Sequence, residues 1–185
     1  ILGWHTYPEP TFWGELKTSG EEVNIWQNEE LSPDAGFVKD DKLYLYYAKN
    51  VSGYLTMRYY VCDLATGSIL EAGDLKNTDA TQYVFMCAYD DVNDVAYAYT
   101  YNADGSAYML QTIKPSTRIF TKICDISKEK LPFMIGYDTS EGCLYGITKA
   151  GDFVKINLTD GSQTIVKATG FKPAPYKQAM TYSPI

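Results

Sequence analysis

Short runs of β-favouring residues alternate with polar turns along most of the chain. Val, Ile, Leu, Phe and Tyr concentrate in runs of four to seven residues, which is the pattern of strands. The clearest runs are Leu43–Tyr47, Asp94–Tyr99, Cys143–Ile147, Leu55–Val61, Ala107–Thr112 and Phe153–Ile156. No segment of 12 or more residues has the 3.6-residue period of an amphipathic helix. The pattern predicts an all-β fold, with at most a short helical turn at Asp125–Lys130.

One turn signal recurs between these runs. The segment Cys62–Leu70 reads CDLATGSIL, and Ile156–Thr164 reads INLTDGSQT, with looser copies at Leu16–Val23 and Thr112–Ile119. Each copy has the pattern of a strand, a tight turn and a second strand, with glycine or a polar residue where the backbone can need a positive φ. The turn positions 20, 67, 117 and 161 are separated by 47, 50 and 44 residues.

Two further landmarks recur in the same order. A second turn series comprises Ser52-Gly53, Asp104-Gly105 and Ala150-Gly151. A strand-like run opens each copy, at Ala35–Val38, Val84–Tyr89, Phe133–Tyr137 and Gln178–Tyr182. Four short antiparallel strands in each unit of about 45 residues predict the blades of a β-propeller, with about four blades' worth of chain. Blades packed face to face bury the apolar surfaces that a single sheet leaves in water.

The repeat divides the chain into one propeller domain or propeller fragment. The units are a partial blade at 1–31, blades at 32–80, 81–130 and 131–170, and the first strand of a further or closing blade at 171–185. In the partial blade, residues 1–7, 12–17 and 22–26 align with second, third and fourth strands. Three assemblies remain open: a fragment of a larger ring, a closed four-bladed ring in which 177–183 complete the N-terminal sheet, and a homodimer.

The third full copy carries a resemblance to a known group of repeats. Residues Gly136–Gly161 read GYDTSEGCLYGITKAGDFVKINLTDG. This segment resembles the divergent propeller repeats of bacterial secreted and surface proteins. It lacks the Gly-His and Trp-Asp dipeptides of WD repeats and the Gly-Gly pair of kelch repeats. The resemblance implies a secreted or cell-surface location and a propeller architecture, but no particular activity.

Composition restricts the classes of partner. Lys and Arg number 16 against 23 Asp and Glu, so the formal net charge is −7. This acidic balance argues against a nucleic-acid partner, because phosphate binding relies on clustered basic residues. No run approaches the roughly 20 apolar residues that a membrane span needs. The 17 tyrosines favour strand structure.

Catalytic and metal signatures are missing from the sequence. His5 is the single histidine, and no GxSxG motif supports a serine relay. The four cysteines, Cys62, Cys87, Cys124 and Cys143, form no CxxC pair and lie in apolar runs. They are expected to be buried thiols, with disulfides an alternative for an exported protein. The acidic segment Asp90–Asp94 is interpreted as a polar hairpin turn. We therefore expect no catalytic residue, metal or cofactor.

Aromatic residues near the N-terminus are the candidates for ligand binding. Trp4, His5 and Trp13 lie close together in sequence and could stack on a sugar or anchor a protein, or else pack inside the first blade. The sequence predicts a non-catalytic binding or scaffold module of an exported bacterial surface protein, with a protein or carbohydrate partner. The alternative is part of a propeller hydrolase of the glycosidase type, with carboxylates at the ring centre.

Overall fold

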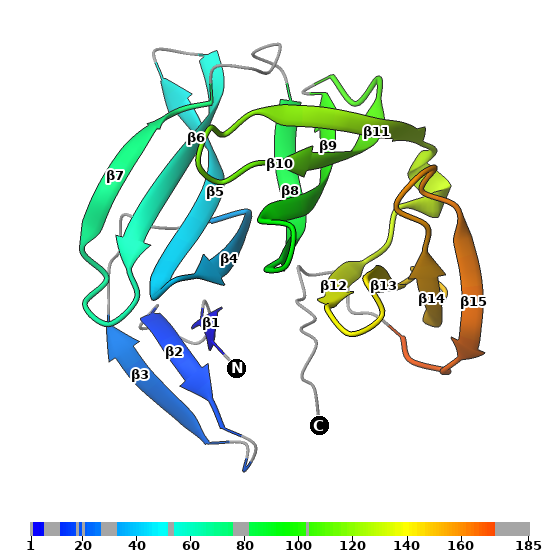
Figure 1. Cartoon of the computed structure of the whole chain (residues 1–185), viewed down its shortest axis with the longest axis horizontal. Coiled ribbons are helices and arrows are strands. Elements are labelled where there is room, and N and C mark those ends of the chain that lie inside the picture. The colour runs from blue at the N-terminus through cyan, green and yellow to red at the C-terminus, as the bar shows by residue number, and fades with distance from the viewer. Residues whose placement is uncertain are drawn as a thin grey trace.

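In the computed structural model, the described residues form four antiparallel β-sheets (Figure 1). It describes residues 2–5, 12–17, 19, 21–26, 33–51, 54–75, 82–102 and 104–172. Within these ranges there is no α-helix, and the one helical turn is the three-residue 3₁₀ segment Lys128–Lys130. The all-β prediction and the short turn expected near Asp125–Lys130 are therefore confirmed.

Three of the sheets have four strands, each in simple sequential order. The second sheet contains β4 (Ala35–Lys39), β5 (Lys42–Val51), β6 (Tyr54–Asp63) and β7 (Ile69–Asp74). The third contains β8 (Gln82–Asp90), β9 (Val95–Asn102), β10 (Tyr108–Ile113) and β11 (Phe120–Ile126). The fourth contains β12 (Met134–Asp138), β13 (Cys143–Ile147), β14 (Asp152–Ile156) and β15 (Gln163–Ala168). Four antiparallel strands in sequential order are the blade that the repeat predicts.

The first sheet contains three described strands, β1 (Leu2–His5), β2 (Phe12–Leu16) and β3 (Glu22–Trp26). They occupy the segments that align with second, third and fourth strands of a blade. The segment 177–183, expected to supply a first strand, lies outside the described residues. The closed ring, the larger ring and the homodimer therefore all stay predictions.

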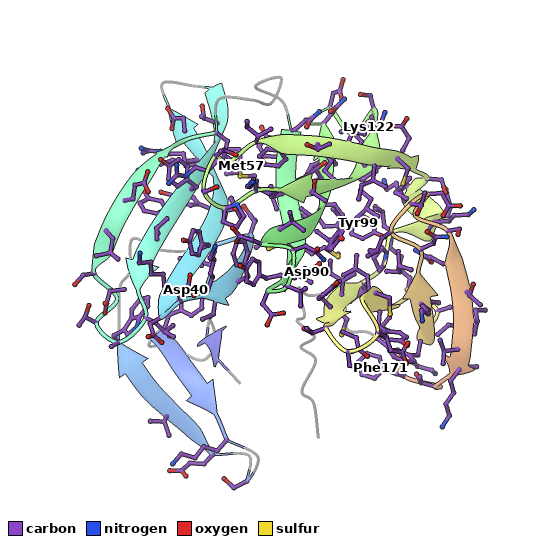
Figure 2. The ribbon with its side chains drawn as sticks, viewed as in Figure 1. Asp40, Met57, Asp90, Tyr99, Lys122 and Phe171 are labelled. Atoms are coloured by element: carbon purple, nitrogen blue, oxygen red, sulfur yellow. The ribbon has the colours of Figure 1, made fainter. Side chains whose placement is uncertain are left out.

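The sheets are arranged radially, with their first strands toward the middle. Figure 1 shows β4, β8 and β12 on the inside of the arc and β7, β11 and β15 on the outside. Apolar side chains fill the spaces between neighbouring sheets. Tyr99, Leu110, Leu144 and Ile156 join the third and fourth sheets in one buried cluster, and Figure 2 shows Tyr99 between these two sheets. The face-to-face packing of apolar sheets thus holds the fold together.

The turn between the third and fourth strands is repeated almost identically. In three sheets, a backbone amide at the end of the third strand donates a hydrogen bond to the carbonyl of the residue five positions later. Examples are Asp63 to Ser68 at 2.9 Å and Asn157 to Ser162 at 2.9 Å. Gly67 and Gly161 take φ values of 70° and 69° within these turns. In the third sheet the corresponding residue is Arg118, with φ 60°. The sequence placed this turn position one residue too early, at 117, because no glycine marks it.

These turns make the same kind of packing contact at three sheet interfaces. Each turn residue lies against the outermost strand of the preceding sheet. A Cβ added to Gly67 would lie 2.3 Å from the ring of Trp26 on β3, and one added to Gly161 would lie 2.6 Å from Cys124 Sγ on β11. At the interface between them, the Arg118 guanidinium lies 4.0 Å from the ring centroid of Tyr59 and pairs with Glu71 on β7. The repeat therefore includes the contacts between blades as well as the blades themselves.

Candidate functional site

The predicted aromatic candidates divide into one buried ring and two positions on β1. Trp13 is 6% exposed and packs against Trp26, with ring centroids 5.6 Å apart. Trp26 Nε1 donates a hydrogen bond to the Leu64 carbonyl at 3.0 Å. The Trp13 ring therefore lies in the buried cluster that joins the first and second sheets. Trp4 and His5 lie on β1, and their side chains fall outside what the structure describes.

A different region brings polar groups from three sheets together. The turns at residues 40–41, 91–94 and 139–142 directly follow the innermost strands β4, β8 and β12, and Figure 2 labels Asp40 and Asp90 near the first two turns. We call them the inner-turn surface. Asp40 and Asp41 have φ values of 49° and 56°, a conformation that Asp tolerates better than most residues. The short side chain of Asp is therefore suited to the tight turn between β4 and β5.

Asp90 fixes the second of these turns from inside. Its side chain is fully buried and accepts bonds from the Val92 and Asn93 amides at 3.0 and 3.1 Å, and from Asn93 Nδ2 at 2.7 Å. Tyr137 of the fourth sheet donates a further hydrogen bond to it. Burial alone would raise the pKa of Asp90, but the bonds from Asn93 and Tyr137 lower it overall. The polar-turn interpretation of Asp90–Asp94 is confirmed.

Asp138 has the same task in the third turn. Its Oδ1 accepts bonds from the Ser140 amide at 2.8 Å and from the Ser140 hydroxyl at 2.6 Å. The neighbouring Glu141 accepts bonds from Lys155 Nζ and the Tyr145 hydroxyl, each at 2.8 Å. Hydrogen bonding from Lys155, with that from Tyr145, lowers the pKa of Glu141.

Polar contacts between sheets hold the three turns in register. Lys39 at the end of β4 pairs with Asp94, which also accepts a hydrogen bond from the Tyr89 hydroxyl at 2.8 Å. The Thr139 hydroxyl donates to Asp91 Oδ1 at 3.0 Å. The third sheet is thereby tied to both neighbours at this end of the molecule, so the inner-turn surface is built on a fixed scaffold.

Val92 is the most exposed large apolar side chain on the described surface. It is 71% exposed at the tip of the β8–β9 turn, between turns that present the exposed residues Asp40, Asp41 and Glu141. Single exposed apolar residues are common, but this one protrudes among ordered polar turns. The surface can therefore offer one apolar contact together with fixed carboxylates.

The perturbed carboxylates have the environment of structural caps. Among the described residues, the pKa is lowered at Asp63, Asp90, Asp94, Asp104, Glu141 and Asp160. Each accepts hydrogen bonds from nearby donors, which favour the charged form. A glycosidase general acid needs a raised pKa instead. These six groups therefore suit turn formation better than proton donation.

The cysteines are free thiols. Cys62 and Cys143 are buried, and Cys87 and Cys124 are partly covered. Burial raises the pKa of Cys62 to about 11 and that of Cys87 to about 12, so both are protonated near neutral pH. In the part of the chain that the structure describes, no three His, Cys, Asp or Glu side chains lie close enough to hold a metal ion. Likewise, no described helix is long and apolar enough to span a membrane.

The sequence did not indicate Val92 or the contacts between turns as functional features. The acidic residues of Asp90–Asp94 predicted a turn, but they did not show which side chain is buried and which is exposed. Asp90 is buried because Tyr137 arrives from another sheet, and no local pattern reports that contact. Strand alternation continued into the turn would have placed Val92 on the face of the buried residues Ala88 and Asp90, so the local pattern gives no signal for its exposure.

Comparison with solved structures identifies the fold. A protein of unknown function from Bacteroides thetaiotaomicron VPI-5482 aligns with a TM-score of 0.51 and 11% identity, over 80% of this chain and 35% of that one. A chain of a nidogen/laminin complex aligns with a TM-score of 0.53 and 16% identity, over 94% and 61%. The chain thus spans about a third and three-fifths of these two neighbours. BamB from Moraxella catarrhalis, with a TM-score of 0.38 and 17% identity over 83% and 41%, is more distant.

The radial four-stranded sheets and these neighbours together define a β-propeller fold. No family model and no curated protein matches the sequence. The fold is therefore shown, while the location and the partner of the chain are matters for proposal.

Proposed function

We propose that this chain is a non-catalytic binding or scaffold module that recognises a protein through the inner-turn surface. The observation that carries this proposal is the 71% exposure of Val92 at the tip of a turn whose base is held by buried Asp90. A protruding apolar residue on a preorganised turn contributes to binding without a large ordering cost. The exposed carboxylates of Asp40, Asp41 and Glu141 favour a partner that offers basic groups.

The proposal places the module in an exported bacterial surface protein. Its support is the resemblance of Gly136–Gly161 to repeats of bacterial secreted and surface proteins. A structural neighbour of unknown function comes from Bacteroides thetaiotaomicron, and another belongs to a complex of nidogen with laminin. At 11% and 16% identity these neighbours support the fold. A carbohydrate remains the alternative ligand, to be tested beside proteins.

The test is a binding screen with two matched variants. Arrays of purified extracellular proteins and of glycans would be probed with wild type, Val92→Ser and Val166→Ser. Val166 is 55% exposed on β15, away from the inner turns. We expect a protein hit that Val92→Ser weakens roughly tenfold or more, a hot-spot loss of about 1.4 kcal/mol, and that Val166→Ser leaves intact.

Two results would contradict this function. One is a protein hit whose affinity neither valine substitution changes, because the binding surface would then lie elsewhere on the molecule. The other is reproducible turnover of glycoside substrates by the purified chain. Loss of that turnover on replacing two carboxylates would support the hydrolase alternative instead.

A further inference from the structure

The β9–β10 hairpin of the third sheet extends farther than the equivalent hairpin of the fourth sheet. The β13–β14 ladder ends at the level of Tyr99 and Leu110, which are 0% exposed in the cluster that joins the two sheets. The β9–β10 ladder continues beyond this level to the pair Tyr101 and Tyr108. Both tyrosines are only half-buried, since the paired strands of the fourth sheet end before they reach them.

The neighbours of Tyr108 fix the position of its ring. The ring stacks on Tyr101 with centroids 6.0 Å apart and an interplanar angle of 30°, and on the other side Tyr108 pairs with Ile126 of β11. A Cβ added to Gly105 would lie 3.9 Å from the Tyr108 hydroxyl, so this hydroxyl lies beside the β9–β10 turn. The equivalent residue of the second sheet is Met57, which is 3% exposed. A half-buried tyrosine at this position is therefore a departure from the repeat.

A groove opens beside this ring. One wall is the segment Gly105–Tyr108, and the other is Asp125–Lys128, where β11 leads into the 3₁₀ turn (Figure 1). We call it the Tyr108 groove. Its volume is about 380 Å³, which lies within the range of small-ligand sites. The groove is at the opposite end of β9 from the turn 91–94, so it is separate from the inner-turn surface.

The Tyr108 groove combines an aromatic ring with hydrogen-bonding groups. Four exposed polar residues line it: Ser106, Asp125, Ser127 and Lys128. The Ser127 hydroxyl does not cap the 3₁₀ turn, so it can face a ligand. The lining carries one carboxylate and one ammonium group, and Lys122 beside it donates a hydrogen bond to Asp125 at 2.7 Å. Charges of both signs favour a neutral ligand with hydroxyl groups over an ion of either sign.

We propose that the Tyr108 groove binds a neutral carbohydrate, with a sugar ring against the side of Tyr108 that faces the groove. A sugar ring has an apolar C–H face and a rim of hydroxyl groups, and it therefore matches an aromatic ring that has polar neighbours. The sugar hydroxyls would bond Asp125, Ser127 and Lys128. A stable protein interface needs a larger surface than this groove offers. The site goes beyond the proposed function, because it is built from different residues at the other end of the sheet.

Titration of the full chain with neutral sugars tests the proposal. The probes are cellobiose, maltose, lactose and N,N′-diacetylchitobiose at up to millimolar concentrations, followed by calorimetry or ligand-observed NMR. We expect at least one probe to bind, and Tyr108→Ala to weaken it about tenfold or more. Tyr108→Phe should bind as wild type does, because stacking needs only the ring. Asp125→Ala should weaken binding several-fold through the lost hydrogen bonds.

Three further variants separate the groove from general damage and from the inner-turn surface. Ser127→Trp fills the groove from an exposed position, and it should abolish binding without lowering the thermal midpoint. Phe171→Ala removes an aromatic ring that is 45% exposed outside the groove, and it should leave sugar binding unchanged, as should Val92→Ser.

Two results would overturn the carbohydrate site. One is the absence of binding by every probe, or binding that Tyr108→Ala and Ser127→Trp leave intact. The other is a protein that binds in a Tyr108-dependent way when no sugar does, because the groove would then be a protein site. Neither result bears on a protein hit that depends on Val92, so the two proposals fail separately.

Discussion

At the scale of single residues, the turn glycines combine a backbone role with a packing role. The sequence predicted tight turns at Gly67 and Gly161, and both adopt the positive φ that glycine allows. It could not predict that Trp26 covers Gly67, because that contact joins two sheets. Arg118 shows the same limit. A long cationic side chain at this turn position is explained only by Tyr59 and Glu71 of the preceding sheet.

A pair of glycine substitutions separates the two roles. Gly67 and Gly105 share a φ of 70°, but a Cβ at Gly105 would meet only the Tyr108 hydroxyl at 3.9 Å. Gly105→Ala is therefore expected to cost about 1 kcal/mol of unfolding free energy, for the backbone alone. Gly67→Ala should cost about 2–5 kcal/mol, because the methyl group collides with the Trp26 ring. Urea unfolding measures both, and equal costs would show that the tryptophan moves aside freely.

At the scale of strands and sheets, the repeat made the architecture predictable. Cys143–Ile147 matches β13 at both ends, while β5 extends to Val51, beyond the expected Tyr47. Residue composition alone does not show where β5 ends, since its pairing with β6 continues through Lys49 and Asn50. The aromatic site was harder to predict. Trp13 lies on β2, and the face of β2 that carries its ring packs against another sheet. The sequence left both the packing and the binding interpretations of Trp13 open.

Burial should decide the energetic importance of aliphatic residues in the fourth sheet. Leu144 is 0% exposed between the third and fourth sheets, whereas Ile165 on β15 is 62% exposed. Leu144→Ala should therefore lower the unfolding free energy by about 2–5 kcal/mol. Ile165→Ala should change it by no more than about 0.5 kcal/mol. Denaturant midpoints at constant slope provide the comparison; a small effect at Leu144 would mean that the sheet interface contributes little to stability.

At the scale of the whole molecule, the lowered carboxylate pKa values connect the turns to solution pH. A carboxyl whose pKa is lower in the folded chain than in the unfolded chain stabilises the fold above its unfolded pKa. That stabilisation is lost as the pH falls through the folded value. The ordinary values are 3.8 for Asp and 4.5 for Glu. The contribution is thus complete at neutral pH and declines in strongly acidic solution.

We therefore expect the urea midpoint to fall when the pH is lowered from about 6 to about 3. Asp90→Asn removes the buried carboxylate that Asn93 and Tyr137 bond. This variant should be less stable at neutral pH and should lose less stability on acidification. Urea titrations at several pH values would measure both effects. An unchanged pH slope in Asp90→Asn would show that Asp90 is not one of the groups whose protonation unfolds the chain.

The packing contact between neighbouring sheets has a direction along the chain. A turn from the later sheet always lies on the outermost strand of the earlier one, as Gly67 does on β3 and Gly161 on β11. Because of this overlap, neighbouring sheets fit together in one order only. Any two molecules that extended each other through these surfaces would consequently meet head to tail, with two different surfaces at every contact.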